Sequence, residues 1–239
     1  MNVYPEVILF DLDDTLISFD GVSDIAWDKC CGDFVELNGT PFSKEILLKT
    51  LHIKRKWYWS DTQRHKLGRE NIRQARRDIV SLTLINLGIT ETYLVNKLAD
   101  TYTDYHNELI CLNPNTIYTL NKLKNIGVRM GLITNGTSEG QREKLKRFSL
   151  TDYFEIILID QELGFGKPDI EVYRHALTLL HLRFHDTWMV GDNLIWDIQA
   201  PQSLGIYSIW YDYKKIGLPK DTMIIPDNII TDISELIIR

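Results

Sequence analysis

Two acidic residues, Asp11 and Asp13, follow the apolar run Val-Ile-Leu-Phe at residues 7–10. Four apolar residues in succession predict a strand that is buried on both faces. Because side chains alternate along an extended chain, we expect Asp11 and Asp13 to point to the same side at the carboxyl end of this strand, where open parallel sheets bind ligands. Two carboxylates this close repel each other and need a cation or a proton, and either is useful in catalysis. The structural alternative is a turn or a helix N-cap, where Asp-x-Asp only accepts backbone hydrogen bonds.

Further polar residues stand where the chain is predicted to leave a strand or enter a helix. They are Thr134 and Asn135, Lys167 before Pro168, Asp192 after Gly191, and Asp197. Taken singly, each has an ordinary explanation as a turn, a solvated lysine or an acid in the first turn of a helix. In a parallel sheet, however, such chain ends lie along one edge. Their joint order therefore favours one site that contains several acids, a hydroxyl group and a cation.

The elements that must position these residues alternate between helical and extended patterns after residue 112. Strands are predicted at 128–133, 156–159, 188–190 and 206–210, and helices at 117–126, 138–148, 172–179 and 197–204. Residues 229–238 are predicted to form a short strand or a helix. This alternation predicts an α/β fold with a doubly wound, Rossmann-like parallel sheet.

The segment between Gly21 and Ile110 has no strand pattern, and its apolar residues recur at helical spacing. Helices are predicted at 25–38, 43–59, 69–87 and 90–105. We therefore expect a core domain from residues 1–17 and 112–239, with an all-helical cap domain, residues 18–111, inserted over the strand ends. Gly21 and Asn113-Pro114, at the two crossings, are candidate hinges.

The basic and aromatic segment 54–59, Lys-Arg-Lys-Trp-Tyr-Trp, is conspicuous in this insertion. Its cations and rings would suit a phosphorylated or planar ligand. The interpretation we favour is a helix with Trp57 buried and the basic residues solvated, so no residue of the insertion is assigned to a site.

The polar segments together resemble the four motifs of the haloacid dehalogenase (HAD) superfamily. The motifs stand here as Asp11-Leu12-Asp13-Asp14-Thr15, Thr134-Asn135, Lys167, and Gly191-Asp192 with Asp197 after four further residues. The helical insertion resembles the cap of that family. Residues 134–136, 141–145 and 162–168 are similar to the branch that holds pyrimidine 5′-nucleotidases and N-acylneuraminate-9-phosphatase. We nevertheless expect residues 141–144 to be an exposed amphipathic helix without a role in substrate binding.

The resemblance implies a phosphatase that depends on magnesium (Mg²⁺) and forms an aspartyl-phosphate. It implies roles for these residues: Asp11 as nucleophile and metal ligand, Asp13 as general acid and base and as metal ligand through its backbone carbonyl, Asp192 as metal ligand, Thr134 and Asn135 for phosphate binding, Lys167 for charge neutralisation, and Asp197 as orienting residue for Lys167 or for the water shell of the metal. We assign Asp14 to a purely structural role.

Several other functions share parts of this pattern. A phosphomutase has the same nucleophile and acid, whereas a dehalogenase needs no proton donor for a halide, so Asp13 favours phosphoryl chemistry. A receiver module also uses clustered acids, a threonine and a lysine, but it has no helical insertion of this size. A non-catalytic binding protein for phosphorylated ligands, with the same fold, is the remaining alternative.

The composition limits the class of partner. The chain has 239 residues, of which 44% are hydrophobic and 25% charged, with a net charge of −6. This charge argues against a nucleic-acid or membrane-surface partner.

The three cysteines form no metal or disulfide pattern and are expected to be buried thiols in a reducing compartment. Residues 1–6 do not resemble a signal peptide. We expect a cytoplasmic monomer or homodimer that binds a small phosphorylated metabolite.

Overall fold

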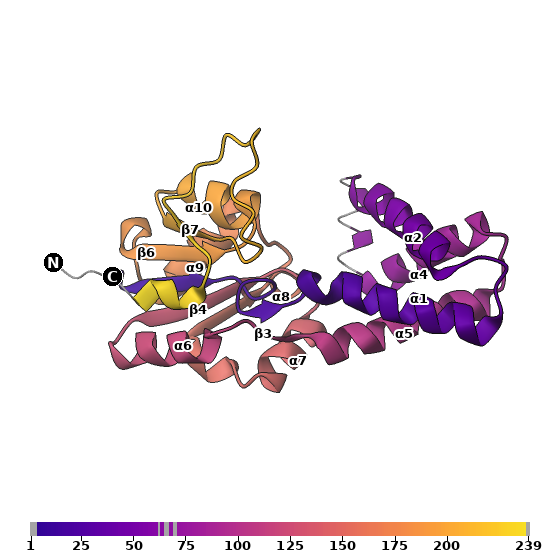
Figure 1. Ribbon diagram of the computed structural model, residues 1–239. Coiled ribbons are helices and arrows are strands. Elements are labelled where there is room, and N and C mark those ends of the chain that lie inside the picture. The colour runs from indigo at the N-terminus through magenta and orange to yellow at the C-terminus, as the bar shows by residue number, and fades with distance from the viewer. Residues whose placement is uncertain (1–3, 62, 65–66, 69–70, 238–239) are drawn as a thin grey trace. The chain divides into compact units, whose positions relative to one another are not determined.

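The computed structural model describes residues 4–61, 63–64, 67–68 and 71–237. The chain forms two compact units, one from Met1–Ser18 with Cys111–Arg239 and one from Phe19–Ile110 (Figure 1). We call them the core unit and the helical unit. Among the residues that the structure describes, no helix is both long and apolar enough to cross a membrane.

A parallel sheet is the centre of the core unit. In the part that the structure describes, its six strands lie in the order β5-β4-β1-β6-β7-β8. Their bounds are β1 Val7–Phe10, β4 Arg129–Thr134, β5 Ile156–Ile159, β6 Thr187–Gly191, β7 Tyr207–Tyr211 and β8 Asn228–Ile230. In the centre, Phe10 of β1 lies opposite Leu132 of β4 and Val190 of β6. The predicted α/β fold with a doubly wound parallel sheet is confirmed.

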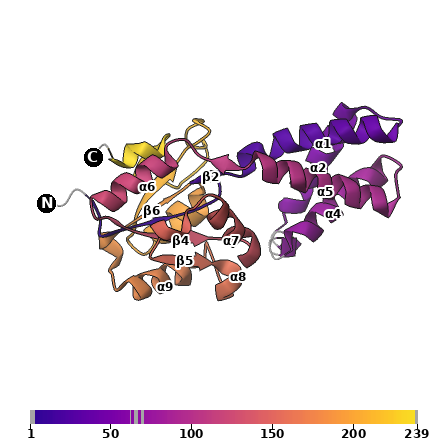
Figure 2. The ribbon, with the colours of Figure 1, turned by 90° about the horizontal axis from the view of Figure 1, so that it is seen from below.

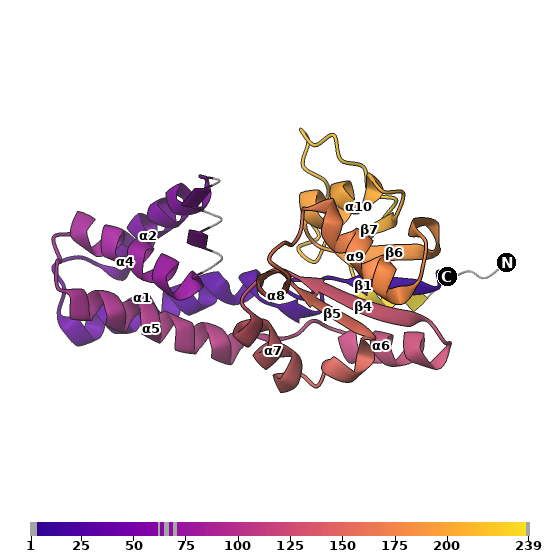
Figure 3. The ribbon, with the colours of Figure 1, turned by 180° about the vertical axis from the view of Figure 1, so that it is seen from behind.

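Helices cover both faces of this sheet. They are α6 Thr116–Asn125, α7 Ser138–Arg147, α8 Asp160–Leu163, α9 Ile170–Leu180, α10 Ala200–Gln202, the π-helical turn Leu194–Gln199 and the 3₁₀ helices Thr151–Tyr153, Phe184–Asp186 and Ile233–Ile237. Figure 3 shows α6 and α7 on one side of the sheet and α9 and α10 on the other. The loops at the carboxyl ends of the strands are therefore framed by helices from both layers.

The central strand β1 is completely buried, which explains its uninterrupted apolar sequence. Val7 and Leu9 pack in the cluster that contains Val172 of α9, and Phe10 contacts the ring of Phe154. Burying each of these side chains contributes about 1.5–3 kcal/mol to stability. This packing holds β1 in place, so the residue after it, Asp11, is delivered to the edge of the sheet.

The structure corrects several predicted details of the core unit. Ile126 and Leu179, the last apolar residues of the predicted helices 117–126 and 172–179, are exposed, because α6 ends at Asn125 and α9 buries Leu177 and Leu180 instead. The helix predicted from Asp197 begins at Leu194, since the side chain of Asn193 caps it. The short helix α8 follows β5, where the sequence predicted no helix, and the C-terminal segment forms both a strand and a 3₁₀ helix.

The two chain crossings are joined by a short antiparallel ladder that the sequence did not predict. β2 Ile17–Ser18 pairs with β3 Cys111–Leu112, and two residues are too few to show a hydrophobic period. The side chain of Asn113 is buried and donates a hydrogen bond to the carbonyl of Thr15 at 3.0 Å. Cys111 is exposed, so the expectation that all three cysteines are buried holds only for Cys30 and Cys31.

The helical unit has a hydrophobic core of its own. Its helices include α1 Ser23–Asn38, α2 Lys44–Trp59, α4 Ile72–Asn86 and α5 Thr92–Leu109, which Figure 2 shows from below. Leu51, Ile79 and Leu98 belong to its buried cluster. Ser43 and Asn71 cap α2 and α4, while Gly39 ends α1 in the left-handed conformation. The described residues of this unit contain no strand; Arg69, the predicted start of the third helix, lies outside them.

The basic and aromatic segment 54–59 lies at the end of α2. Trp57, which we expected to be buried, is 49% exposed, whereas Tyr58 is 8% exposed. The reason is the phase of the helix, because Tyr58 follows Leu47 and Leu51 on its buried side. The guanidinium of Arg64 lies 3.8 Å from the centre of a Trp57 ring. The exposed indole is therefore covered by a cation of its own chain.

Candidate active site

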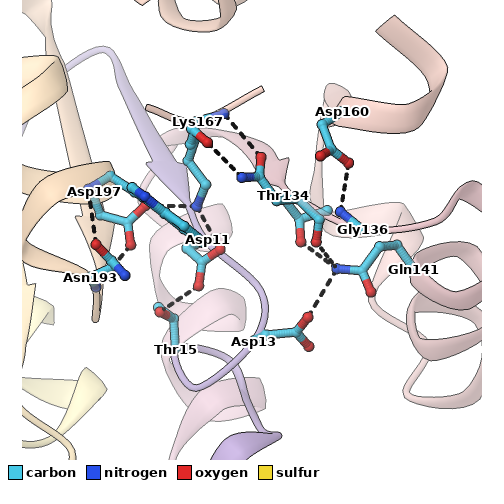
Figure 4. A network of polar contacts seen from close by, with 12 residues as sticks. Asp11, Asp13, Thr15, Thr134, Gly136, Gln141, Asp160, Lys167, Asn193 and Asp197 are labelled. Carbon is cyan, nitrogen blue, oxygen red and sulfur yellow. Dashed lines mark hydrogen bonds and ion pairs between the residues drawn. The ribbon is translucent and has the colours of Figure 1, made fainter. Parts of the chain in front are cut away.

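A buried lysine joins two aspartates at the carboxyl edge of the sheet. The Nζ atom of Lys167 lies 2.6 Å from Asp11 Oδ1 and 2.6 Å from Asp197 Oδ1 (Figure 4). The hydroxyl of Thr15 donates a hydrogen bond to the other oxygen of Asp11 at 3.0 Å. Both oxygens of the Asp11 carboxylate are thus held in place.

Asp11 extends the pairing of the central strand. Its backbone N–H donates to the carbonyl of Val190 at 2.9 Å, one residue beyond β1. The chain then turns, because the N–H groups of Leu16 and Ile17 both donate to the carbonyl of Leu12. Asp14 lies in this turn at φ 61°, where no helix begins, so its structural role is that of a turn residue. The alternation of side chains therefore does not continue from Asp11 to Asp13.

The loop that presents Lys167 is held by Asn135. The Asn135 side chain accepts from the N–H of Lys167 at 3.0 Å and donates to the carbonyl of Lys167 at 2.6 Å. A Cβ atom on Gly166 would overlap Asp160 and Asn135, so only glycine fits there. The side chain of Asn135 thus fixes the backbone of Lys167, which leaves the backbone of Asn135 for the predicted binding of phosphate.

Asp192 and Asp197 come from the end of β6 and the turn that follows it. The N–H of Asn193 donates to Asp197 Oδ2 at 3.0 Å, and a Cβ atom on Gly191 would overlap the Asp197 carboxyl group. Asp11, Asp192 and Asp197 each offer one carboxylate oxygen, and these three atoms lie within 4.8 Å of one another. Such a group can hold a metal ion.

The electrostatics of this group favour an additional cation. Burial raises the pKa of Asp11 to about 7, with further increases from the negative charges of Asp197 and Asp13, although Lys167 opposes them. Burial and the charges of Asp11, Asp197 and Asp14 raise the pKa of Asp192 well above its usual range. Burial alone would lower the pKa of Lys167, but Asp11 and Asp197 raise it. Three carboxylates thus face one ammonium group.

Asp13 points away from this cluster, toward helix α7 (Figure 4). Its two oxygens lie 2.7 and 2.9 Å from the Nζ atom of Lys144, and Gln141 Nε2 donates to one of them at 3.1 Å. The same amide nitrogen donates to the hydroxyl oxygen of the buried Thr134. The expected close pair of Asp11 and Asp13 carboxylates is therefore replaced by a link from Asp13 to α7.

The prediction that residues 141–144 form an exposed amphipathic helix is right for the helix and for Arg142 and Glu143, but it is wrong for Gln141, which is buried. Gln141 is only 3% exposed, and both Gln141 and Lys144 contact Asp13. The spacing of Gln141 and Lys144 could have predicted these contacts. Residues three apart lie on the same face of a helix, and α7 begins soon after Thr134-Asn135. Asp160, which accepts a hydrogen bond from the N–H of Gly136 at 2.6 Å, was also missed.

Comparison with known proteins gives three further findings. The family model described as haloacid dehalogenase-like hydrolase matches residues 33–211. The glyceraldehyde 3-phosphate phosphatase of Methanocaldococcus jannaschii is 28% identical over 202 residues, which are 84% of this chain and 82% of that protein. Rat (Rattus norvegicus) N-acylneuraminate-9-phosphatase is 32% identical over 109 residues, 46% of this chain and 44% of that one.

A solved structure is similar over nearly the whole length. The HAD hydrolase YfnB of Bacillus subtilis, solved with bound magnesium, superposes with a TM-score of 0.74 at 22% identity and covers 98% of this chain and 96% of its own. This similarity shows the fold. The predicted family is confirmed by the match to the family model: the chain belongs to the haloacid dehalogenase-like hydrolase family.

Proposed function

We propose that this chain is a phosphatase that hydrolyses the phosphoric monoester of a small metabolite with the help of Mg²⁺ and through an aspartyl-phosphate on Asp11. The observation that carries the proposal is the contact of 2.6 Å between Asp11 Oδ1 and the ammonium group of Lys167. It supplies a carboxylate nucleophile in a fixed position together with a positive charge that offsets the repulsion of an incoming phosphate.

The first chemical step uses Asp11 and Asp13. An oxygen of Asp11 attacks phosphorus, the bond between phosphorus and the ester oxygen breaks, and Asp13 gives its proton to the leaving oxygen. Water then attacks phosphorus while Asp13 takes its proton, and the bond from Asp11 to phosphorus breaks. The products are the alcohol and inorganic phosphate, and both carboxyl groups return to their starting forms.

The phosphoryl oxygens are bound by groups at the end of β4 and by the lysine. We assign this role to the hydroxyl group of Thr134, to the backbone of Asn135 and to the ammonium group of Lys167. Donors that are already in place act mainly on the charge that develops in the transition state. Asp197 keeps Lys167 in position, since its Oδ1 atom lies 2.6 Å from Nζ.

The acid cluster fits a magnesium ion. Among the described residues, none donates a hydrogen bond to the Asp192 carboxylate. Burial and the neighbouring acids raise its pKa, so its charged form would be stabilised by a bound cation. Hard oxygen ligands of this kind are those that Mg²⁺ prefers. Asp11, Asp192 and the backbone carbonyl of Asp13 would hold the ion, and its charge would neutralise the phosphoryl oxygens. We assign Asp197 to positioning instead, because its two oxygens accept hydrogen bonds from Lys167 and from the N–H of Asn193.

The substrate is a small phosphorylated metabolite, and we assign its selection to the helical unit, acting as a cap domain. Two relatives are named for phosphorylated sugar-like compounds, glyceraldehyde 3-phosphate and N-acylneuraminate 9-phosphate. Together with nucleoside monophosphates, suggested by the motif resemblance, these compounds define the first set of candidate substrates.

The test is phosphate release from p-nitrophenyl phosphate and from these metabolites, with Mg²⁺ or with EDTA. Wild type should release phosphate only with Mg²⁺, and Asp11→Asn should abolish turnover. The matched control is Asp221→Asn, the same substitution at an exposed aspartate. If wild type released no phosphate from any ester, the phosphatase proposal would be wrong, and transfer to a second sugar phosphate or halide release would be measured next.

A further inference from the structure

The amide group of Gln141 lies at the centre of a hydrogen-bond network that the proposed mechanism does not use. Its Nε2 atom donates to the hydroxyl oxygen of Thr134, to Asp13 Oδ2 at 3.1 Å and to the carbonyl of Asn135 at 3.2 Å. Its Oε1 atom accepts a hydrogen bond from Lys144 Nζ at 2.8 Å. Every polar atom of this buried side chain is thus in use, and Figure 4 shows the contacts of its nitrogen atom with Asp13 and Thr134.

Lys144 determines which way round the amide lies. An ammonium group has only donors, so it must face the oxygen of the amide and not its nitrogen. The NH₂ group of Gln141 then has to face Thr134 and Asp13. The orientation follows from the chemistry of the partners.

This orientation has a consequence for the hydroxyl group of Thr134. Its oxygen accepts from Gln141, so its own hydrogen cannot point at Gln141 and has to point elsewhere. A hydroxyl that serves a phosphoryl oxygen must donate to it, because phosphoryl oxygens are acceptors. Gln141 therefore leaves Thr134 with the donor that the proposed reaction requires.

We propose that Gln141, oriented by Lys144, is a positioning residue that directs the hydroxyl of Thr134 toward the phosphoryl group and sets the resting place of the Asp13 carboxylate. The inference rests on the proposed phosphatase function and adds two residues to it. Neither residue is a catalytic group, since each acts through Thr134 or Asp13.

The helix that carries both residues is well anchored near the site. The side chain of Thr137 caps α7 by accepting from the N–H of Gly140 at 3.2 Å, and the N–H of Ser138 donates to Gln161 Oε1 at 2.7 Å. A Cβ atom on Gly136 would lie 3.0 Å from the Gln141 side chain, so glycine lets the loop pack closely on it. The Gln141 side chain is thus positioned by the close packing of the loop at Gly136 as well as by its hydrogen bond from Lys144.

The first test is Gln141→Met, which keeps a long side chain but removes the donors. The kcat for the best ester of the substrate panel should fall by about 10- to 100-fold. This range is typical of the loss of a residue that orients an active-site group through a hydrogen bond. The control is Gln74→Met, the same change at an exposed glutamine of helix α4, which should leave kcat unchanged. Equal kcat values for the two variants would overturn the inference.

A double-mutant cycle with Thr134→Val separates positioning from simple packing. If Gln141 acts through the Thr134 hydroxyl, Gln141→Met should add little to the loss already caused by Thr134→Val. Losses that multiply would show that the two residues act independently and would count against the proposal.

Lys144 offers a second route in case Gln141→Met does not fold. Lys144→Met should lower kcat, whereas Lys144→Arg should keep most of it, because arginine also has only donors. The matched control is Lys146→Met at an exposed position of the same helix. A loss that arginine does not restore would contradict the orienting role. An active wild type with unaffected variants refutes only this inference, while an inactive wild type refutes the proposed function and the inference with it.

Discussion

The Nζ atom of Lys167 lies 2.6 Å from Asp11 Oδ1, although the two residues are 156 positions apart in the chain. The contact is buried, and the same ammonium group is equally close to Asp197. A cation shared by two buried carboxylates is costly to remove, because both acids lose their partner at once.

Lys167→Met is therefore expected to lower both stability and activity. Loss of one partner from a buried ion pair costs about 3–5 kcal/mol of unfolding free energy, and loss of a charge at the phosphoryl group should reduce kcat by about 100-fold or more. Denaturant unfolding and phosphate release measure the two effects. Lys146→Met, at an exposed position, is the control, and equal stability of both variants would contradict the role of the buried pair.

The pH dependence of stability should report on Asp11 in metal-free protein. Burial, with the nearby charges of Asp197 and Asp13, raises its pKa from 3.8 to about 7. Between these values the folded state holds a proton that the unfolded state has released, so stability falls as pH rises from about 4 to about 7 and changes no further above that. Unfolding in EDTA at pH 5 and pH 8 should show this loss for wild type and a smaller one for Asp11→Asn. An identical loss in the variant would mean that other groups cause it.

Gly191→Ala tests the close approach of β6 to Asp197. A Cβ atom at this position would overlap the Asp197 carboxyl group, so the substitution should displace it and weaken its contact with Lys167. We expect reduced thermal stability and reduced kcat. The control is Gly32→Ala in helix α1, where the nearest atom, on Lys44, would lie 3.4 Å away. That substitution should be neutral or stabilise by about 0.5–1 kcal/mol.

Asn135→Ala distinguishes a binding role of this residue from a positioning role. Its side chain holds both the N–H and the carbonyl of Lys167, whereas its own backbone is unchanged by the substitution. We expect kcat to fall, because Lys167 is no longer held, with a smaller change in KM. Steady-state kinetics on one ester measures both constants. A rise in KM alone would instead indicate that the side chain binds substrate.

Much of the fold was predictable because its signals are local. A strand buried on both faces must be apolar throughout, so residues 7–10 identify β1 without knowledge of its neighbours. The apolar run 156–159 likewise predicted β5, although in this edge strand only Leu158 and Ile159 are buried. The polar residues that follow such strands must reach the edge of a parallel sheet. This reasoning predicted one shared site for Asp11, Asp192 and Asp197, and one carboxylate oxygen of each lies within 4.8 Å of the others, although the sequence indicated Asp13 and not Asp197 as the third metal ligand.

Features that depend on the path of the chain were not predictable in this way. The strands β2 and β3 have two residues each, too few to show an alternation of apolar and polar side chains. Which residues of α6 and α9 are buried depends on where each helix ends. The direction of Asp13 depends on the turn after β1, which reverses the alternation expected of an extended chain.

The sequence by itself determined the class of fold, the family and the residue types of the candidate site, because hydrophobic period and motif order are properties of short segments. Only the tertiary structure decided which atoms meet. Gln141 and Lys144 reach Asp13 across 128 and 131 positions of the chain. A contact of this range depends on the angle at which α7 leaves β4 and on the turn that carries Asp13. No local pattern encodes those angles, since they follow from the packing of the whole sheet and its helices.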